Sequence, residues 1–351
     1  RGGHPYGADS LKASNGGVIP NLNPPQFVLI TRPLAALTPR SALAVWMAAS
    51  LLSAVAALVL IARATSATPL AIGAMLLLVT CSAATGAFVV AMQVTWLLWG
   101  PLAWSWVAMR RGRWTSAAVI VGVLVSLKPF LLPLLFVFVA WRRWGALAAA
   151  MSSAALAYAV GIAAFGWDAF SGWLHGLGTI TWAGQIFNAS IYALWTRGFE
   201  GIATAVWPLA PVVVAPRAIV PLWALSSVVL LALSAWSLRH EAPPRREGAP
   251  DAATRAIDRA WLVLTAAALL VSPVGWIYYL FFLTGPVLAW WTTGDDRLTW
   301  PRVAMMAALA LLMVSPDVLA GAQPHGWASV TLGSGYMWSL LLIWIAALPQ
   351  R

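Results

Sequence analysis

The feature that most constrains this chain is a series of long apolar stretches, each separated from the next by a few polar residues. A helix needs about 20 apolar residues to cross a hydrocarbon core of roughly 30 Å. The pattern therefore predicts an all-α fold, a polytopic transmembrane helical bundle. The clear apolar stretches cover about 41–62, 69–88, 90–109, 145–165, 218–238, 303–316 and 329–348.

The composition agrees with lipid as the main solvent. Hydrophobic types make up 61% of the residues and charged types 9%, whereas a soluble domain carries about 25% charged residues. With one cysteine, Cys81, and four scattered histidines, the chain cannot form an internal disulfide, and we expect no metal site. The net charge of +11 comes from residues between the apolar stretches. This favours membrane topology over nucleic-acid binding as its explanation.

Two further apolar stretches contain proline breaks. Residues 115–141 are interrupted by Lys128-Pro129, and residues 260–291 by Ser272-Pro273 and by Gly275. Each is either one long tilted helix or a hairpin of two short helices, since proline disfavours a straight helix. Two hairpins would place most of the 21 basic residues on one side, as the positive-inside tendency requires, and two single spans would not.

The hairpin arrangement gives about eleven helices in one transmembrane domain, residues 1–351. We expect residues 1–38 and 166–217 to form outer, periplasmic loops and residues 239–259 a cytoplasmic loop. The expected location is a bacterial cytoplasmic membrane, crossed many times. Because the chain starts at Arg1 without a methionine, we also expect an N-terminally truncated sequence that lacks one helix.

Lys128 is the most informative single residue. An ammonium group within an apolar stretch costs several kcal/mol unless it is paired or hydrated. At an outward hairpin apex it could bind a lipid-linked phosphate, or it could extend to the interface as an anchor. Gln93 could bond a substrate or a neighbouring helix, and Asn23, before two prolines, could face a ligand.

An enzyme acting on the outer face would need a carboxylate base there. Asp9 lies in the first outer loop and is a candidate base, although a solvated loop acid is the simpler interpretation. At the second apex, Trp276, Tyr278 and Tyr279 could stack on sugar faces or anchor the chain at the interface. Asn188 begins a match to an N-glycosylation acceptor, which we interpret as accidental in a bacterial-looking chain.

Seven short motifs occur in order along most of the chain. They are Gly3-His4-Pro5-Tyr6, Asn23-Pro24-Pro25, Gln93, Arg110-Arg111-Gly112-Arg113, Leu127-Lys128-Pro129, Arg142-Arg143-Trp144 and Ser272-Pro273-Val274-Gly275-Trp276. Their order and spacing resemble the polytopic glycosyltransferases of the GT-C superfamily. More narrowly, they resemble glycosyltransferase family 87, the bacterial α-1,2-mannosyltransferases that use polyprenyl-phosphate-mannose.

The resemblance implies an inverting transfer of a sugar, mannose, on the outer face, from a polyprenyl-phosphate-sugar donor to a cell-envelope glycolipid or glycan. No cofactor is implied. Lys128 would lie near the donor phosphate. The other implied substrate-binding residues are Tyr6 in the first motif, Asn23, Gln93, Asn188 and Trp276, with Tyr278 and Tyr279 beside them.

This sequence departs from the family pattern in two places. The family's catalytic Asp precedes the Gly-x-x-Pro-Tyr stretch, whereas Asp9 follows it, so the resemblance puts the base upstream of this chain. Many members have histidines where this chain has Tyr278 and Tyr279, which leaves the sugar and the acceptor open. A related arabinofuranosyltransferase, a lipid or amphiphile transporter, and a structural subunit of the cell envelope are the alternatives.

Overall fold

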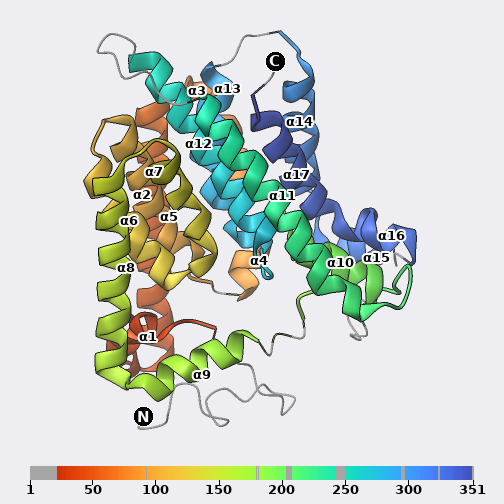
Figure 1. Ribbon diagram of the computed structural model, residues 1–351, viewed down its shortest axis with the longest axis horizontal. Coiled ribbons are helices and arrows are strands. Elements are labelled where there is room, and N and C mark those ends of the chain that lie inside the picture. The colour runs from red at the N-terminus through yellow and green to blue at the C-terminus, as the bar shows by residue number, and fades with distance from the viewer. Residues whose placement is uncertain are drawn as a thin grey trace.

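The computed structural model describes residues 22–91, 93–178, 180, 182–202, 208–241, 250–293, 297–322 and 325–349. The regular elements of this part are helices, which confirms the predicted all-α bundle (Figure 1). The α-helices are α1 (Pro25–Thr31), α2 (Pro39–Thr65), α3 (Pro69–Cys81), α4 (Ala83–Ala91), α5 (Thr95–Arg110), α6 (Trp114–Leu127), α7 (Phe136–Ala140), α8 (Trp144–Phe165), α9 (Trp167–Leu177), α10 (Ile191–Phe199), α11 (Ile219–His240), α12 (Pro250–Val271), α13 (Thr284–Thr293), α14 (Trp300–Leu312), α15 (Pro316–Gly321), α16 (Trp327–Val330) and α17 (Gly335–Ala347). The 3₁₀ helices are η1 (Arg32–Ala36), η2 (Pro129–Leu135), η3 (Pro216–Ala218), η4 (Ile277–Leu283) and η5 (Leu332–Ser334).

The long helices run between two ends of the bundle. In Figure 1, α2 and α8 run from the end where α1 and α9 lie toward the end near α13, whereas α11 runs toward α10. Helix α12 occupies the middle, and its residues 262–270 are all buried. The core is therefore built around α12, with the longer apolar helices outside it.

Threonine-proline pairs start two of the apolar helices. The Thr38 hydroxyl accepts a hydrogen bond from the Ser41 amide at 3.2 Å, and Thr68 accepts one from Ala71 at 3.3 Å. In each case the proline occupies the first helical position, where its missing N–H is not needed. These starts follow directly from the local sequence.

Membrane-spanning length is reached by fewer helices than the predicted eleven. By length and composition, four helices of the described part can cross a membrane, or five if α3 and α4 count as one span bent by 48°. The bend follows from Ser82, whose backbone is extended between the two helices. Several predicted spans are thus built from shorter pieces, and the chain is a multi-pass membrane protein.

Residues 114–141 form a hairpin rather than a single span. Helix α6 ends at Leu127, and η2 and α7 carry the chain back. The rings of Trp114 and Trp141, at the two ends of the segment, lie with centroids 5.8 Å apart. Because the ends meet, the hairpin alternative holds for this stretch.

The second broken stretch also folds back. Helix α12 leads into the break at residues 272–276, and η4 and α13 return the chain. Trp261 of α12 and Pro286 of α13 line one small cavity together with Ile61 of α2. Both predicted hairpins are therefore present.

The start of each hairpin lies at one end of the bundle, which we call the arginine end. Arg110 donates to the carbonyl of Ala64 and lies 3.1 Å from Asp258 of α12. Trp141 donates to the carbonyl of Leu238 at 2.9 Å. These contacts join the ends of α2, α5, α7, α11 and α12. The arginine end carries Arg63, Arg110, Arg111, Arg113, Arg142, Arg143, Arg239 and Arg259.

The predicted loop at 239–259 is helical at both ends. Helix α11 runs to His240, and α12 begins at Pro250. Asp258 is buried in α12, where Trp106 donates to it at 3.0 Å. The predicted outer loop at 166–217 likewise contains α9 and α10.

Candidate functional site

A cavity of about 880 Å³ lies where the two hairpins break. Its walls come from the turn before α1, the break between α4 and α5, η2, the segment after α9, α11, and the turn between α12 and η4. The breaks thus bring together segments that are far apart in sequence. Five predicted site residues besides Lys128 line the cavity: Asn23, Gln93, Trp276, Tyr278 and Tyr279.

Lys128 lies at the break of the first hairpin, as the C-cap of α6. Pro129 follows it and starts η2, because proline has no N–H with which to continue the α-helix. The ammonium Nζ donates to Asn23 Oδ1 at 3.0 Å and lies 5.9 Å from the centre of the Tyr279 ring. The residue is only 8% exposed, so a positive charge is held among largely apolar walls.

Asn23 is held opposite Lys128 by its neighbours. The Leu22 carbonyl accepts a hydrogen bond from Trp173 of α9 at 3.2 Å. The side-chain amide nitrogen Nε2 of Gln26 donates to the backbone carbonyl of Ser126 at 2.6 Å. Ser126 lies two residues before Lys128. The segment before α1 is therefore fixed against the end of α6.

Gly161 lets α8 approach α1 closely. A Cβ atom at this position would lie 2.7 Å from the backbone nitrogen of Gln26 and 2.9 Å from its side-chain oxygen Oε1. Any larger residue would push α1 away from the end of α6. The position of Asn23 thus depends on a glycine in another helix.

Aromatic rings form part of the cavity wall. Phe130 and Tyr279 have centroids 4.6 Å apart, and Tyr278 and Tyr279 are 4.8 Å apart. Trp276 lies 5.1 Å from Phe187. The cavity therefore combines one ammonium group, two side-chain amides, two phenols and the serine Ser272 with apolar and aromatic surface.

Asn188 has a different place from the one the resemblance implied. It is fully buried, and its Nδ2 donates to the carbonyls of Ala183 at 2.7 Å and Pro273 at 2.8 Å. Its Oδ1 accepts from the Ser190 amide at 3.2 Å. Asn188 is not among the residues that line the cavity. It fastens the segment that carries Phe187 to the turn that carries Trp276.

Gln93 lies between α4 and α5, and it lines the cavity from that side. Tyr6 and Asp9 lie outside the described residues, so their predicted roles stay predictions. No carboxylate is among the cavity's lining residues in the described part of the chain.

Arg197 of α10 is a buried cation that the sequence did not single out. It is fully buried, and it donates to Ser334 Oγ at 2.9 Å and to the carbonyl of Gln185 at 3.0 Å. Burial lowers the pKa of its guanidinium to about 9. The contacts tie α10 to the segment before Asn188. The amphipathic pattern of α10 did not indicate this, because Arg197 lies on the polar face of the helix, which by the usual rule would face solvent.

Within the described residues, no group of three or more His, Cys, Asp or Glu side chains is placed to hold a metal ion. A comparison with protein families matches residues 21–273, more than half of the chain, to glycosyltransferase family 87. Comparisons with curated proteins and with solved structures found no match.

Proposed function

Because this chain belongs to glycosyltransferase family 87, we propose that its donor is a polyprenyl-phosphate-linked sugar, with mannose as the sugar. The acceptor in this proposal is a glycolipid or glycan of the cell envelope. A glycosyltransferase needs a donor and an acceptor, and the cavity at the two breaks is the candidate site for both. The observation that carries the proposal is the buried ammonium of Lys128 in a cavity of about 880 Å³.

A lipid-linked phosphate matches both the apolar surface and the positive charge of this cavity. Apolar side chains from η2 and α11 suit a prenyl chain, and Lys128 offers one positive charge to a phosphate oxygen. Desolvation makes an unpaired ammonium unfavourable, and a phosphate would offset that penalty through a charge-assisted hydrogen bond. The volume lies in the range of pockets for small ligands, about 300–1,000 Å³.

The aromatic wall supports binding of the sugar. Trp276, Tyr278 and Tyr279 offer ring faces for stacking and phenol hydroxyls for bonding to sugar hydroxyls. Asn23 and Gln93 add amide groups on other sides. A sugar carried by a phosphate at Lys128 would lie between these groups.

The proposed reaction inverts the configuration at the anomeric carbon. An acceptor hydroxyl loses its proton to a carboxylate and attacks the anomeric carbon, and the bond from that carbon to the phosphate oxygen breaks. The leaving phosphate gains negative charge, which the Lys128 ammonium stabilises. Asp9 remains the candidate base within this sequence.

In the proposal, the arginine end faces the cytoplasm and the cavity opens toward the outer half of a bacterial cytoplasmic membrane. The concentration of arginines at one end supports this orientation. A cysteine placed at position 142, in a Cys81→Ser background, tests it in intact cells. Labelling of that cysteine by an impermeant reagent added outside would reject the orientation.

The test of function uses purified protein in lipid vesicles with polyprenyl-phosphate-[14C]mannose and a membrane glycolipid extract. Label that moves to a glycolipid, and that Lys128→Ala abolishes, supports the proposal. Arg217→Gln is the charge-matched control, because Arg217 is exposed and does not line the cavity. A parallel reaction with polyprenyl-phosphate-arabinose distinguishes the arabinofuranosyltransferase alternative.

Binding of unlabelled polyprenyl phosphate is measured beside the transfer reaction. Saturable binding that Lys128→Ala weakens supports the donor site independently of the catalytic base. Equal binding by wild type and Lys128→Ala would remove the lysine from the site. Movement of the lipid between leaflets without transfer of label would instead favour a transporter.

A further inference from the structure

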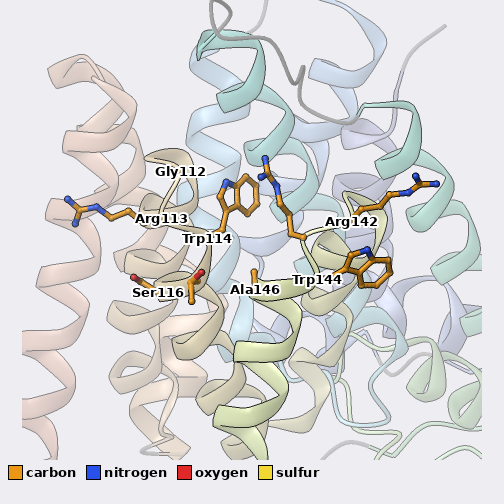
Figure 2. Close-up of a pocket in the computed structure, with 10 residues that line it drawn as sticks. Gly112, Arg113, Trp114, Ser116, Arg142, Trp144 and Ala146 are labelled. Atoms are coloured by element: carbon orange, nitrogen blue, oxygen red, sulfur yellow. The ribbon is translucent and has the colours of Figure 1, made fainter.

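A second cavity, of about 500 Å³, opens at the arginine end (Figure 2). Two turns form it: residues 112–116 at the start of α6 and residues 142–146 at the start of α8. Its lining includes three arginines and no acidic residue. It shares no lining residue with the cavity at Lys128, so the proposed transferase site does not explain it.

The two turns have the same backbone construction. Each begins with a residue in the left-handed region, Gly112 with φ +72° or Arg142 with φ +54°. The next residue is the N-cap of the following helix: Arg113 with φ −84° and ψ 60°, or Arg143 with φ −89° and ψ 62°. The turns therefore form a matched pair on either side of the cavity.

Arg142 is unfavourable for the backbone of its turn. A left-handed residue at a helix end is ordinarily glycine, as at Gly112, because a side chain there costs on the order of 1 kcal/mol. The turn therefore does not need an arginine for its own geometry. What Arg142 adds is a guanidinium at the edge of the cavity.

The arginines are spread around the opening. Figure 2 shows Arg113 and Arg142 extending to opposite sides, with Trp114 between them. The Arg143 guanidinium lies over the Trp114 ring, 4.8 Å from its centre. Charges spread in this way suit a phospholipid headgroup at the opening better than one small chelated ion.

Tryptophan places the cavity at the level of lipid headgroups. Trp144 is 58% exposed beside Arg143, and exposed indole rings next to arginines are typical of the bilayer interface. The N-caps Arg113 and Arg143 make no side-chain cap hydrogen bond. The first amides of α6 and α8 thus add partial positive charge to the same lining.

We infer that this cavity binds the phosphate of an anionic phospholipid from the leaflet at the arginine end. Three arginines supply the charge, the exposed tryptophan sets the depth, and the open volume accommodates the headgroup. A soluble phosphate compound has the same charged group but no need of an exposed indole at the rim. The cavity therefore fits a lipid headgroup better than a soluble phosphate compound.

Native mass spectrometry of the detergent-purified protein measures the apparent Kd for phosphatidylglycerol and for phosphatidylcholine. We expect tighter binding of phosphatidylglycerol, weakened about fivefold by Arg113→Gln and about fivefold by Arg142→Gly. Arg142→Gly is informative because glycine suits its backbone, so thermal stability is kept or raised while the charge is lost. Arg111→Gln is the matched control, since Arg111 is exposed nearby but does not line the cavity.

Two results would overturn the inference. Equal weakening of phosphatidylglycerol binding in all three variants would mean that general surface charge is responsible. Displacement of the lipid by inorganic phosphate at the same concentration would point to a soluble ligand. Neither measurement depends on sugar transfer, so lipid binding at this cavity is tested independently of the proposed function.

Discussion

The two hairpins have the same order of elements but differ in burial and in the contacts at their breaks. Each starts with a long α-helix, α6 or α12, and breaks at a turn that contains a proline. Each then returns through a seven-residue 3₁₀ helix, η2 or η4, followed by a shorter α-helix. The difference between them lies in what surrounds the break and what the break holds.

Burial separates the two return arms. Every residue of η4 is buried, and α12 before it forms the centre of the bundle. In the first hairpin, Leu132 of η2 is 51% exposed and Val139 of α7 is 42% exposed. The second hairpin is therefore packed inside the bundle, and the first lies at the edge of the bundle, where lipid can reach it.

The two breaks also differ in the hydrogen bonds that hold them, and the break of the second hairpin is held by more of them. The turn at 272–276 accepts hydrogen bonds at Pro273 from Asn188 and at Gly275 from the Ala189 amide, 2.7 Å away. Beside the first break, Gln26 makes one bond to Ser126, and the break itself carries Lys128. A firmly fastened break can supply a rigid aromatic wall, while the other presents the charge.

The largest expected effect is a loss of stability on substitution at the second break. In Gly275→Ala the new Cβ would overlap the Leu269 carbonyl oxygen and lie 3.3 Å from Ser190 Cβ. We expect a loss of about 3 kcal/mol of stability or failure to fold, because backbone cannot move aside cheaply. Thermal unfolding of the purified protein measures it. Gly86→Ala, where a Cβ meets nothing within 4 Å, should be neutral or stabilising.

The next effect concerns ligand binding rather than stability. Lys128→Met should weaken binding of polyprenyl phosphate about 100-fold, through loss of one charge-assisted bond. Thermal stability should stay level or rise, because the variant no longer buries an ammonium group. A variant that unfolds instead would show that Lys128 is a structural residue, contrary to the contrast between the hairpins.

Asn188→Ala should lower stability and leave lipid-phosphate binding largely intact, the reverse of what we expect for Lys128→Met. It removes two donated bonds and one accepted bond at a fully buried site, so we expect a loss of about 2 kcal/mol in stability. Thermal unfolding and lipid-phosphate binding are measured together. A large loss of affinity at unchanged stability would make Asn188 a ligand-contacting residue.

Gln26→Met should have the smallest effect, about 1 kcal/mol in unfolding free energy. The variant loses one bond to Ser126, and it also loses a buried side-chain oxygen without a hydrogen-bond partner. The ratio of this effect to that of Asn188→Ala quantifies how differently the two breaks are fastened. Equal losses would remove the distinction.

The sequence was sufficient for the helical bundle, because hydrophobic length is a property of single segments. For the two broken stretches it left a single span and a hairpin open, and the distribution of arginines favoured the hairpin that the structure shows. It also placed Lys128 and Trp276 at the breaks, since proline marks a break locally. Asn23 and Gln93 on the same cavity followed from the family resemblance rather than from pattern.

The sequence could not reveal contacts made between segments. Asn188 matched a surface acceptor pattern, but the structure buries it against Pro273, 85 positions later. Arg197 lies in the predicted outer loop at 166–217, and its bonds to Ser334 and Gln185 join segments that no sequence pattern brings together. The bend at Ser82 was hidden because apolar residues continue on both sides of it.

The 3₁₀ return arms change how far a short segment reaches. A 3₁₀ helix rises about 2.0 Å per residue against about 1.5 Å for an α-helix, so the seven residues of η2 cover about 14 Å instead of about 10 Å. A segment of seven residues can thus return about halfway through a hydrocarbon core of roughly 30 Å. In this arm Leu131, Pro133, Leu134 and Leu135 are buried, whereas Pro129 and Leu132, three positions apart, are exposed. A search for helical periodicity of 3.6 would overlook such an arm.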